Sequence, residues 1–216
     1  MPEPIAAEIR AAAALLLRAP DEQVVTILSE GEEPGPQALA AARQDYFEVI
    51  CIPQSGRFVP PYEHVVRAAR RDGEMWFFPP ARYDGGDVVA HIFRNFGFER
   101  RALDVEPLWA PPHLPADHLG FMLAFVAWGL DGLAKVDDVV HATWSDELAW
   151  FVEQHLDGWT EIYADLLADR GGTYLGAVAD AVWTSVELVR ETLAPVSAGG
   201  ASVIGTDGTH AATPNG

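Results

Sequence analysis

The stretch LPADHLGFMLAFVAWGL, residues 114–130, decides the fold of this 216-residue chain. From residue 119 to residue 130 it contains no charged side chain. A helix that is apolar on every face is one that other helices surround. The apolar run is also well short of the roughly 20 residues that a membrane span needs. The sequence therefore predicts the central helix of a soluble domain.

The polar start of this stretch predicts how the helix begins. Pro115 suits the first helical position, where its missing N–H costs nothing. Asp117 would then lie in the first turn, near the positive end of the helix dipole, and would form an acid–imidazole pair with His118. Two interpretations of this pair remain open: a cap for local backbone groups, or part of a binding site. We expect the helix to be broken near residues 131–132.

Apolar residues at helical spacing predict further helices on both sides of the central one. The expected segments are residues 4–18, 21–28, 39–50, 88–96, 139–152, 159–167 and 174–193. Asp84 is expected to cap the fourth of these and Gly97 to end it. No strand pattern of convincing length and no internal repeat is present. The predicted fold is all-α, a single-domain bundle of about eight or nine helices over residues 1–194, followed by a disordered Gly/Ala/Thr-rich tail at 195–216.

The composition limits the classes of partner. The chain carries 32 Asp+Glu against 14 Lys+Arg, a formal net charge of −18. This charge argues against nucleic acid and against an anionic membrane surface, and it favours a basic partner or a highly soluble surface. Cys51 is the only cysteine, so an internal disulfide and a Cys-rich zinc site are excluded. No basic segment followed by an apolar one marks the N-terminus, and we expect a cytoplasmic protein.

Two proline-stopped stretches are candidates for a binding surface. Residues 58–66 contain Pro60 and Pro61, which hold the chain extended, and Tyr62 follows them. Residues 75–80 are of the same kind. An ordinary rigid loop is the competing interpretation of the first stretch. Trp76 and Trp109 lie in loops and are candidate groove aromatics, whereas the other tryptophans, at 128, 144, 150, 159 and 183, are expected in the core.

Signatures of enzymes are absent from the sequence. There is no G-x-S-x-G elbow, phosphate loop, G-x-G-x-x-G or H-E-x-x-H motif, and no Glu is followed by a His three residues later. We therefore expect no catalytic residues, no metal and no cofactor. Two alternatives stay open: an all-α metalloprotein that uses scattered histidines, and a helical scaffold without a peptide groove.

Three motifs in order carry a resemblance to a known family. They are VPPYE at 59–63, a helix ending in FGF at 96–98, and PADHL at 115–119 leading into an apolar helix. Over residues 5–193 the chain resembles the TorD/DmsD family of cytoplasmic chaperones for molybdenum-cofactor oxidoreductases. The resemblance implies an all-helical, non-enzymatic protein. Such chaperones bind the N-terminal leader of an oxidoreductase subunit, often a twin-arginine export signal, and hold the subunit until its cofactor is inserted.

The resemblance also implies a leader site and a partner. Carried onto this chain, the peptide-binding residues would be Pro60, Pro61, Tyr62, Glu63, Asp117 and His118. The sequence departs from the family pattern at His64-Val65-Val66, where family members often have Ser-Val followed by an aromatic residue. The implied partner is the leader and the apo form of a molybdopterin oxidoreductase catalytic subunit, with the chaperone a monomer or a homodimer. A carboxylate can bind a leader arginine in a bidentate manner, which suits the acidic charge of the chain.

Overall fold

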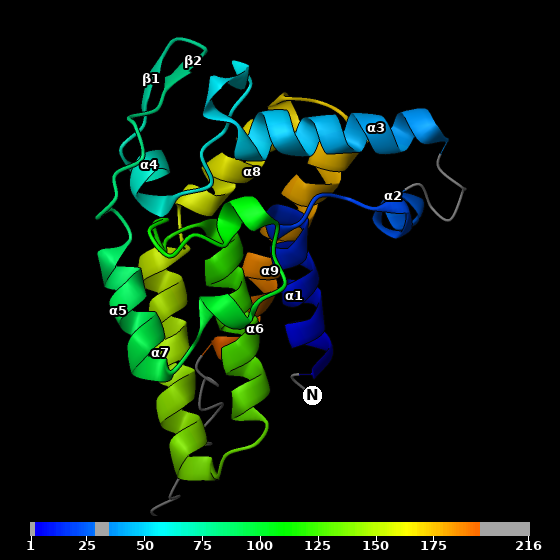
Figure 1. Cartoon of the computed structure of the whole chain (residues 1–216). Helices are drawn as coiled ribbons and strands as arrows, with labels where there is room; N and C mark the ends of the chain where they lie inside the picture. The colour runs from blue at the N-terminus through cyan, green and yellow to red at the C-terminus, as the bar shows by residue number, and fades with distance from the viewer. Residues whose placement is uncertain (1–2, 29–34, 195–216) are drawn as a thin grey trace, which may run out of the picture.

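The structure is a computed structural model that describes residues 3–28 and 35–194 (Figure 1). The described residues form nine α-helices and one short antiparallel ribbon, so the prediction of a single all-α domain is confirmed. The elements are α1 (Glu3–Leu17), α2 (Glu22–Leu28), α3 (Pro36–Asp45), α4 (Glu63–Arg67), β1 (Arg70–Asp72), β2 (Met75–Phe77), α5 (Asp87–Phe96), α6 (Leu119–Leu133), α7 (Asp138–His155), α8 (Trp159–Asp169) and α9 (Thr173–Leu193). The predicted tail at 195–216 lies outside the described residues.

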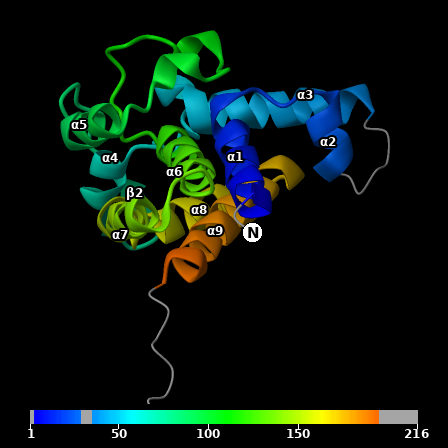
Figure 2. The ribbon, with the colours of Figure 1, turned by 90° about the horizontal axis from the view of Figure 1, so that it is seen from below.

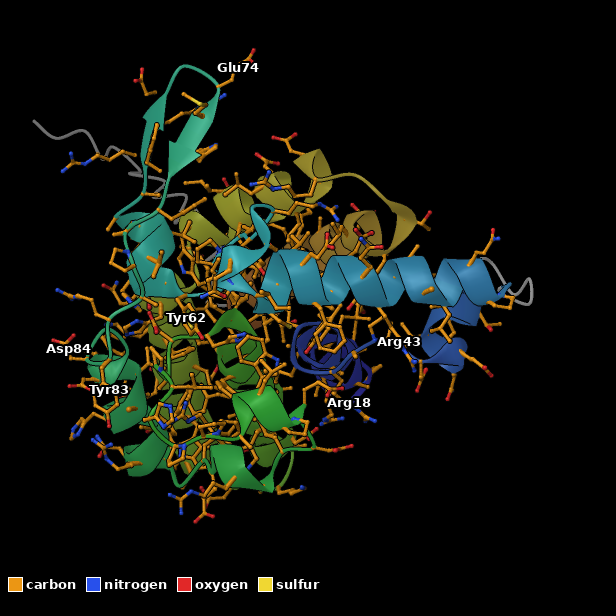
Figure 3. All side chains as sticks on the ribbon, turned by 45° about the horizontal axis from the view of Figure 1, so that its top comes forward. Arg18, Arg43, Tyr62, Glu74, Tyr83 and Asp84 are labelled. Carbon is orange, nitrogen blue, oxygen red and sulfur yellow. The ribbon has the colours of Figure 1, made fainter. Side chains whose placement is uncertain are left out.

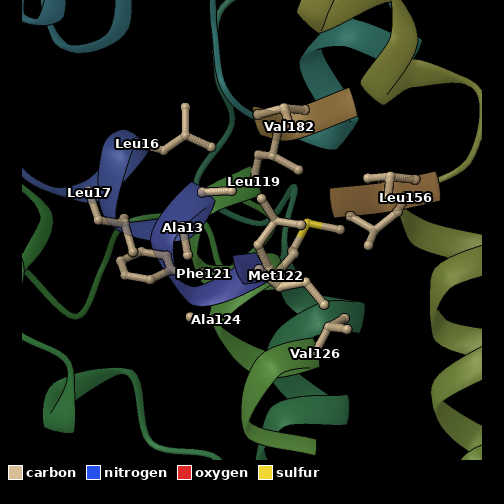
Figure 4. Close-up of a cluster of buried hydrophobic side chains, with 14 of the residues drawn as sticks. Ala13, Leu16, Leu17, Leu119, Phe121, Met122, Ala124, Val126, Leu156 and Val182 are labelled. Carbon is tan, nitrogen blue, oxygen red and sulfur yellow. The ribbon is translucent and has the colours of Figure 1, made fainter. Parts of the chain in front are cut away.

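Helix α6 is the centre of the bundle, as its apolar sequence predicts. Nearly every residue of α6 is buried, and Figure 2 shows the helix between α1 on one side and α7 on the other. Its Leu119, Phe121 and Met122 lie in a cluster with Leu16 of α1 and Val182 of α9 (Figure 4). Burial of a side chain of this size stabilises the fold by about 1.5–3 kcal/mol, so the buried side chains of α6 contribute strongly to the stability of the core.

Two glycines let neighbouring helices approach α6 closely. A Cβ at Gly120 would lie 2.6 Å from Cγ of Leu17, and one at Gly129 would lie 2.7 Å from a methyl group of Leu148. Both distances are far shorter than a normal contact between carbon atoms. The glycines of α6 therefore set how closely α1 and α7 pack against it.

The predicted start and end of the central helix are wrong. Helix α6 begins at Leu119, with His118 as its N-cap, so Pro115 is not in the first helical position and Asp117 is not in the first turn. The helix also continues through Asp131 and Gly132 to Leu133. Long-range backbone pairing at residues 117–119, described below, holds the chain extended there and moves the helix start.

Three smaller differences concern the flanking segments. The N-cap of α5 is Gly86, and Asp84 is an exposed turn residue, although Gly97 ends the helix in the left-handed conformation as predicted. Helix α3 gives way to a π-helical turn at Tyr46–Cys51. The ribbon β1–β2 projects from the bundle at the top of Figure 1, and its three-residue strands are too short to give an alternating pattern. No helix in the described part is long and apolar enough to cross a membrane.

Candidate functional site

Two motifs far apart in the sequence meet as a short antiparallel pair. The N–H of Leu119 donates to the carbonyl of Pro61 at 2.8 Å, and the N–H of Glu63 donates to the carbonyl of Asp117 at 3.1 Å. These two bonds form a bridge between Tyr62 and His118. The Pro-Pro-Tyr-Glu and Asp-His motifs, which the sequence assigns to one site, therefore share one backbone unit.

The Asp117 carboxylate is buried and accepts a hydrogen bond from the start of α4, although Asp117 itself precedes α6. Its Oδ2 accepts the backbone N–H of His64, in the first turn of α4, at 2.8 Å. The same oxygen lies 2.6 Å from Nδ1 of the His64 ring. Nε2 of that ring accepts the N–H of Arg82 at 3.0 Å, so Nδ1 carries the proton and donates it to Asp117. The expected acid–imidazole pair exists, but its imidazole belongs to His64 and not to His118.

His118 lies beneath this carboxylate, out of reach of solvent. Its Nδ1 accepts the N–H of Gly120 at 3.1 Å, which caps α6. Its ring packs between Trp109 at 4.5 Å and Tyr62 at 5.4 Å, measured between ring centroids. Burial, with a smaller effect of Arg100, lowers the pKa of His118 to about 3. The imidazole is therefore neutral at physiological pH. It fills the space between the Trp109 and Tyr62 rings and caps α6.

Glu63 connects the Pro-Pro-Tyr-Glu motif to the end of α7. One carboxylate oxygen accepts from Nε of Arg67 at 2.8 Å, and the other lies 3.0 Å from Nδ1 of His155 at the end of α7. Arg67 also donates to the carbonyls of Gln154 and Asp157. Glu63 and Arg67 thus fix α4 against the turn between α7 and α8.

An apolar cavity of about 570 Å³ opens beside the paired motifs. We call it the proline-lined cavity; its lining residues are Cys51, Pro53, Gly56, Phe58, Pro60, Tyr62, Phe78, Pro79, Pro80, Ala81 and Trp109. Both proline-stopped stretches of the sequence contribute to it. Tyr62, labelled in Figure 3, lines the cavity and belongs to the segment that precedes α4. Burial, followed by the Asp117 charge, raises the pKa of the Tyr62 hydroxyl, so the ring lines the cavity in its neutral form.

The two loop tryptophans have different positions. Trp109 is only 5% exposed but lines the proline-lined cavity, so its place as a candidate groove aromatic stays a prediction. Its indole N–H donates to the hydroxyl of Tyr46 at 2.9 Å, a contact between distant segments that no local pattern reveals. Trp76 lies on β2, half-buried, stacked on Phe78. Among the tryptophans expected in the core, Trp159 is buried, but Trp150 and Trp183 are each 45% exposed.

Some residues of the site are absent from the sequence-based candidates. His64 begins the segment in which the sequence departs from the family pattern, and the structure makes its ring the partner of Asp117. The sequence signal that could have identified His64 is its position directly after the VPPYE motif. Phe78 and Pro80 lie in the second proline-stopped stretch. The sequence marks this stretch as a candidate binding surface but does not single out these two residues. The described residues contain no group of three or more His, Cys, Asp or Glu side chains placed to hold a metal ion.

Comparison with known proteins identifies the family to which the chain belongs. The family described as nitrate reductase delta subunit matches residues 3–164. The chain belongs to this family. Members of the nitrate reductase delta subunit family are maturation chaperones for molybdoenzymes, in agreement with the TorD/DmsD resemblance. The matched range includes both paired motifs and every residue that lines the proline-lined cavity. No curated protein and no solved structure matches the chain.

Proposed function

We propose that this chaperone binds the N-terminal leader of its client, the catalytic subunit of a molybdoenzyme, in the proline-lined cavity. The observation that carries the proposal is the cavity itself, an apolar space walled by two proline-stiffened segments in a chain of charge −18. A twin-arginine leader combines basic side chains with an apolar segment. The apolar segment fits the cavity, and the acidic surface attracts the arginines.

The six peptide-binding residues divide into two roles under this proposal. Pro60 and Tyr62 line the cavity and contact the leader. Asp117 and His118 are buried, so they act as positioning residues that hold the Tyr62 segment in place. Pro61 contributes through its carbonyl and Glu63 through its contacts with α7. By binding the leader, the chaperone holds the apo subunit in the cytoplasm until the cofactor is inserted.

A pair of adjacent phenylalanines tests the proposal. Phe78 lines the cavity, whereas the neighbouring Phe77 is 52% exposed and does not. We expect Phe78→Ala to weaken binding of the leader by about tenfold or more, because a buried aromatic contact is worth about 1.5–3 kcal/mol. Phe77→Ala should bind as the wild type does. Calorimetric titration with the leader of a molybdoenzyme subunit encoded beside this chain measures both affinities.

Cys51 supplies an independent readout of occupancy. It is the only cysteine, it lines the cavity, and burial raises the pKa of its thiol to about 12. Alkylation of the thiol should therefore be slow at neutral pH and should slow further when the leader is bound. Equal weakening in both phenylalanine variants, or alkylation that the leader does not affect, would place the leader elsewhere.

A further inference from the structure

A second cavity, of about 540 Å³, is also lined by Trp109. Its aromatic walls come from Phe93, Phe98 and Phe121, and Trp109 lines both this cavity and the proline-lined cavity. We call this second space the arginine cavity, because Arg94, Arg100 and Arg101 also line it.

The charge of the arginine cavity is opposite to that of the chain. Three of the 14 Lys+Arg residues line it, and Glu99 is the one carboxylate among its lining residues. Within residues 3–28 and 35–194, none of the three arginines forms an ion pair. Positive charge gathered in a concave site attracts an anionic group.

The three arginines differ in what they can offer to a ligand. Arg100 is half-buried and donates to the carbonyl of Leu114 at 3.1 Å, with its guanidinium 5.0 Å from the centroid of the Phe121 ring. Burial lowers its pKa from the usual value, with a smaller effect of the charge on Arg101. Arg94 and Arg101 are exposed, and in the described part their guanidinium groups make no hydrogen bond. Their donors are therefore available to a ligand.

We propose that the arginine cavity binds a carboxylate side chain on an apolar segment of the client subunit, beyond its leader. This inference rests on the proposed function, which supplies the client as the partner. A carboxylate can bind the guanidinium of Arg94 or Arg101 through two parallel hydrogen bonds, while its apolar neighbours cover the phenylalanine walls.

Two labelled peptides test the inference by fluorescence anisotropy on the full-length chain. One is a hexapeptide of Ala, Leu and Phe with two Glu residues, and the other has Gln in place of each Glu. We expect the Glu peptide to bind at least tenfold more tightly. The double variant Arg94→Gln with Arg101→Gln should abolish this preference. The matched double variant Arg70→Gln with Arg170→Gln, which removes two exposed charges elsewhere, should keep it.

Three results would overturn the inference. They are equal affinity for the two peptides, equal loss in both double variants, and displacement of the Glu peptide by a nucleoside triphosphate at a lower concentration than by free glutamate. The leader peptide separates this test from the proposed function, since its affinity should be unchanged in the Arg94→Gln, Arg101→Gln variant. Failure of the leader alone to bind would contradict the proposed function and leave the carboxylate site standing.

Discussion

At the scale of single residues, the site depends on two side chains that solvent does not reach. Asp117 is 1% exposed and His118 is fully buried. Each accepts a hydrogen bond from the first turn of a helix, Asp117 from α4 and His118 from α6. Polar groups at such depth are costly unless they are paired. The two hydrogen bonds therefore connect the starts of α4 and α6, while Oδ1 of Asp117 and Nε2 of His118 have no hydrogen-bond partner in the described part of the chain.

The depressed pKa of His118 makes stability depend on pH. The pKa is about 3 in the folded protein, below the ordinary 6.5. As pH falls below 6.5 the unfolded chain takes up the proton first, so this contribution is complete above pH 6.5. Between pH 6.5 and 3 the free energy of unfolding should fall by up to about 1.4 kcal/mol per pH unit.

The variant His118→Asn isolates this dependence. Asparagine also caps helices well, so it keeps an acceptor for Gly120 and removes the titrating ring. We expect lower stability at pH 7, because the smaller side chain leaves space beside Trp109, but a flatter decline toward pH 4. Urea unfolding at several pH values measures this, with the exposed His141→Asn as control. Parallel stability curves for wild type and His118→Asn would contradict the assignment.

Asp117 should contribute more to stability than an ordinary helix cap. Asp137 caps α7 by accepting the N–H of Val140 at 3.0 Å, and it is exposed. Asp137→Ala should cost about 1 kcal/mol. Asp117→Ala should cost about 2–4 kcal/mol, because it leaves the part-buried N–H of His64 and its ring without their acceptor. Thermal unfolding compares them, and a similar loss in both variants would mean that the His64 contact adds nothing.

At the scale of elements, the N-terminus of α5 is held against residues 116–117. A Cβ at Gly86 would collide with the backbone nitrogen of Ala116 and would lie 2.9 Å from Oδ1 of Asp117. A backbone neighbour cannot move aside as a flexible side chain can. We expect Gly86→Ala to cost about 1–3 kcal/mol by overpacking.

Gly35 provides the matched control for this substitution. It is the N-cap of α3, as Gly86 is of α5, and no atom lies within 4 Å of a Cβ built on it. Gly35→Ala should therefore change the free energy of unfolding by no more than about 0.5 kcal/mol, since a lost cap preference and reduced freedom of the unfolded chain oppose each other. Equal effects at both glycines in chemical denaturation would show that sterics do not hold α5 in place.

Features that depend on residues close in the sequence were predictable from it, and features that depend on contacts between distant segments were not. The apolar run of α6 and the left-handed Gly97 follow from neighbouring residues, so both were predicted correctly. The start of α6 depends on pairing of residues 117–119 with residues 61–63. The buried Trp109 contacts two residues from other parts of the sequence, since its indole N–H donates to the hydroxyl of Tyr46 and its ring packs against His118. The resemblance linked the two motifs of the site, but the identity of the partner of Asp117 required the structure.

At the scale of the whole molecule, charge is distributed unevenly. The chain is strongly acidic, yet carboxylates are absent from the proline-lined cavity and only Glu99 lines the arginine cavity. Under the proposed function, the acidic surface is therefore expected to attract a basic leader over a distance and not by direct contact in either cavity. Long-range attraction of this kind raises association rates and is sensitive to ionic strength.

The salt dependence of leader binding follows from this distribution. We expect the affinity for an arginine-bearing leader to fall as salt rises from 0.01 M, where charges act over about 30 Å, to 0.15 M, where they act over about 8 Å. A leader with both arginines replaced by glutamine should bind more weakly at low salt and vary little, because only its apolar contacts in the cavity remain. Calorimetric titrations of both peptides at the two salt concentrations make the comparison. Equal affinity of the arginine-bearing leader at both concentrations would mean that the acidic surface takes no part in binding and that the cavity alone selects the leader.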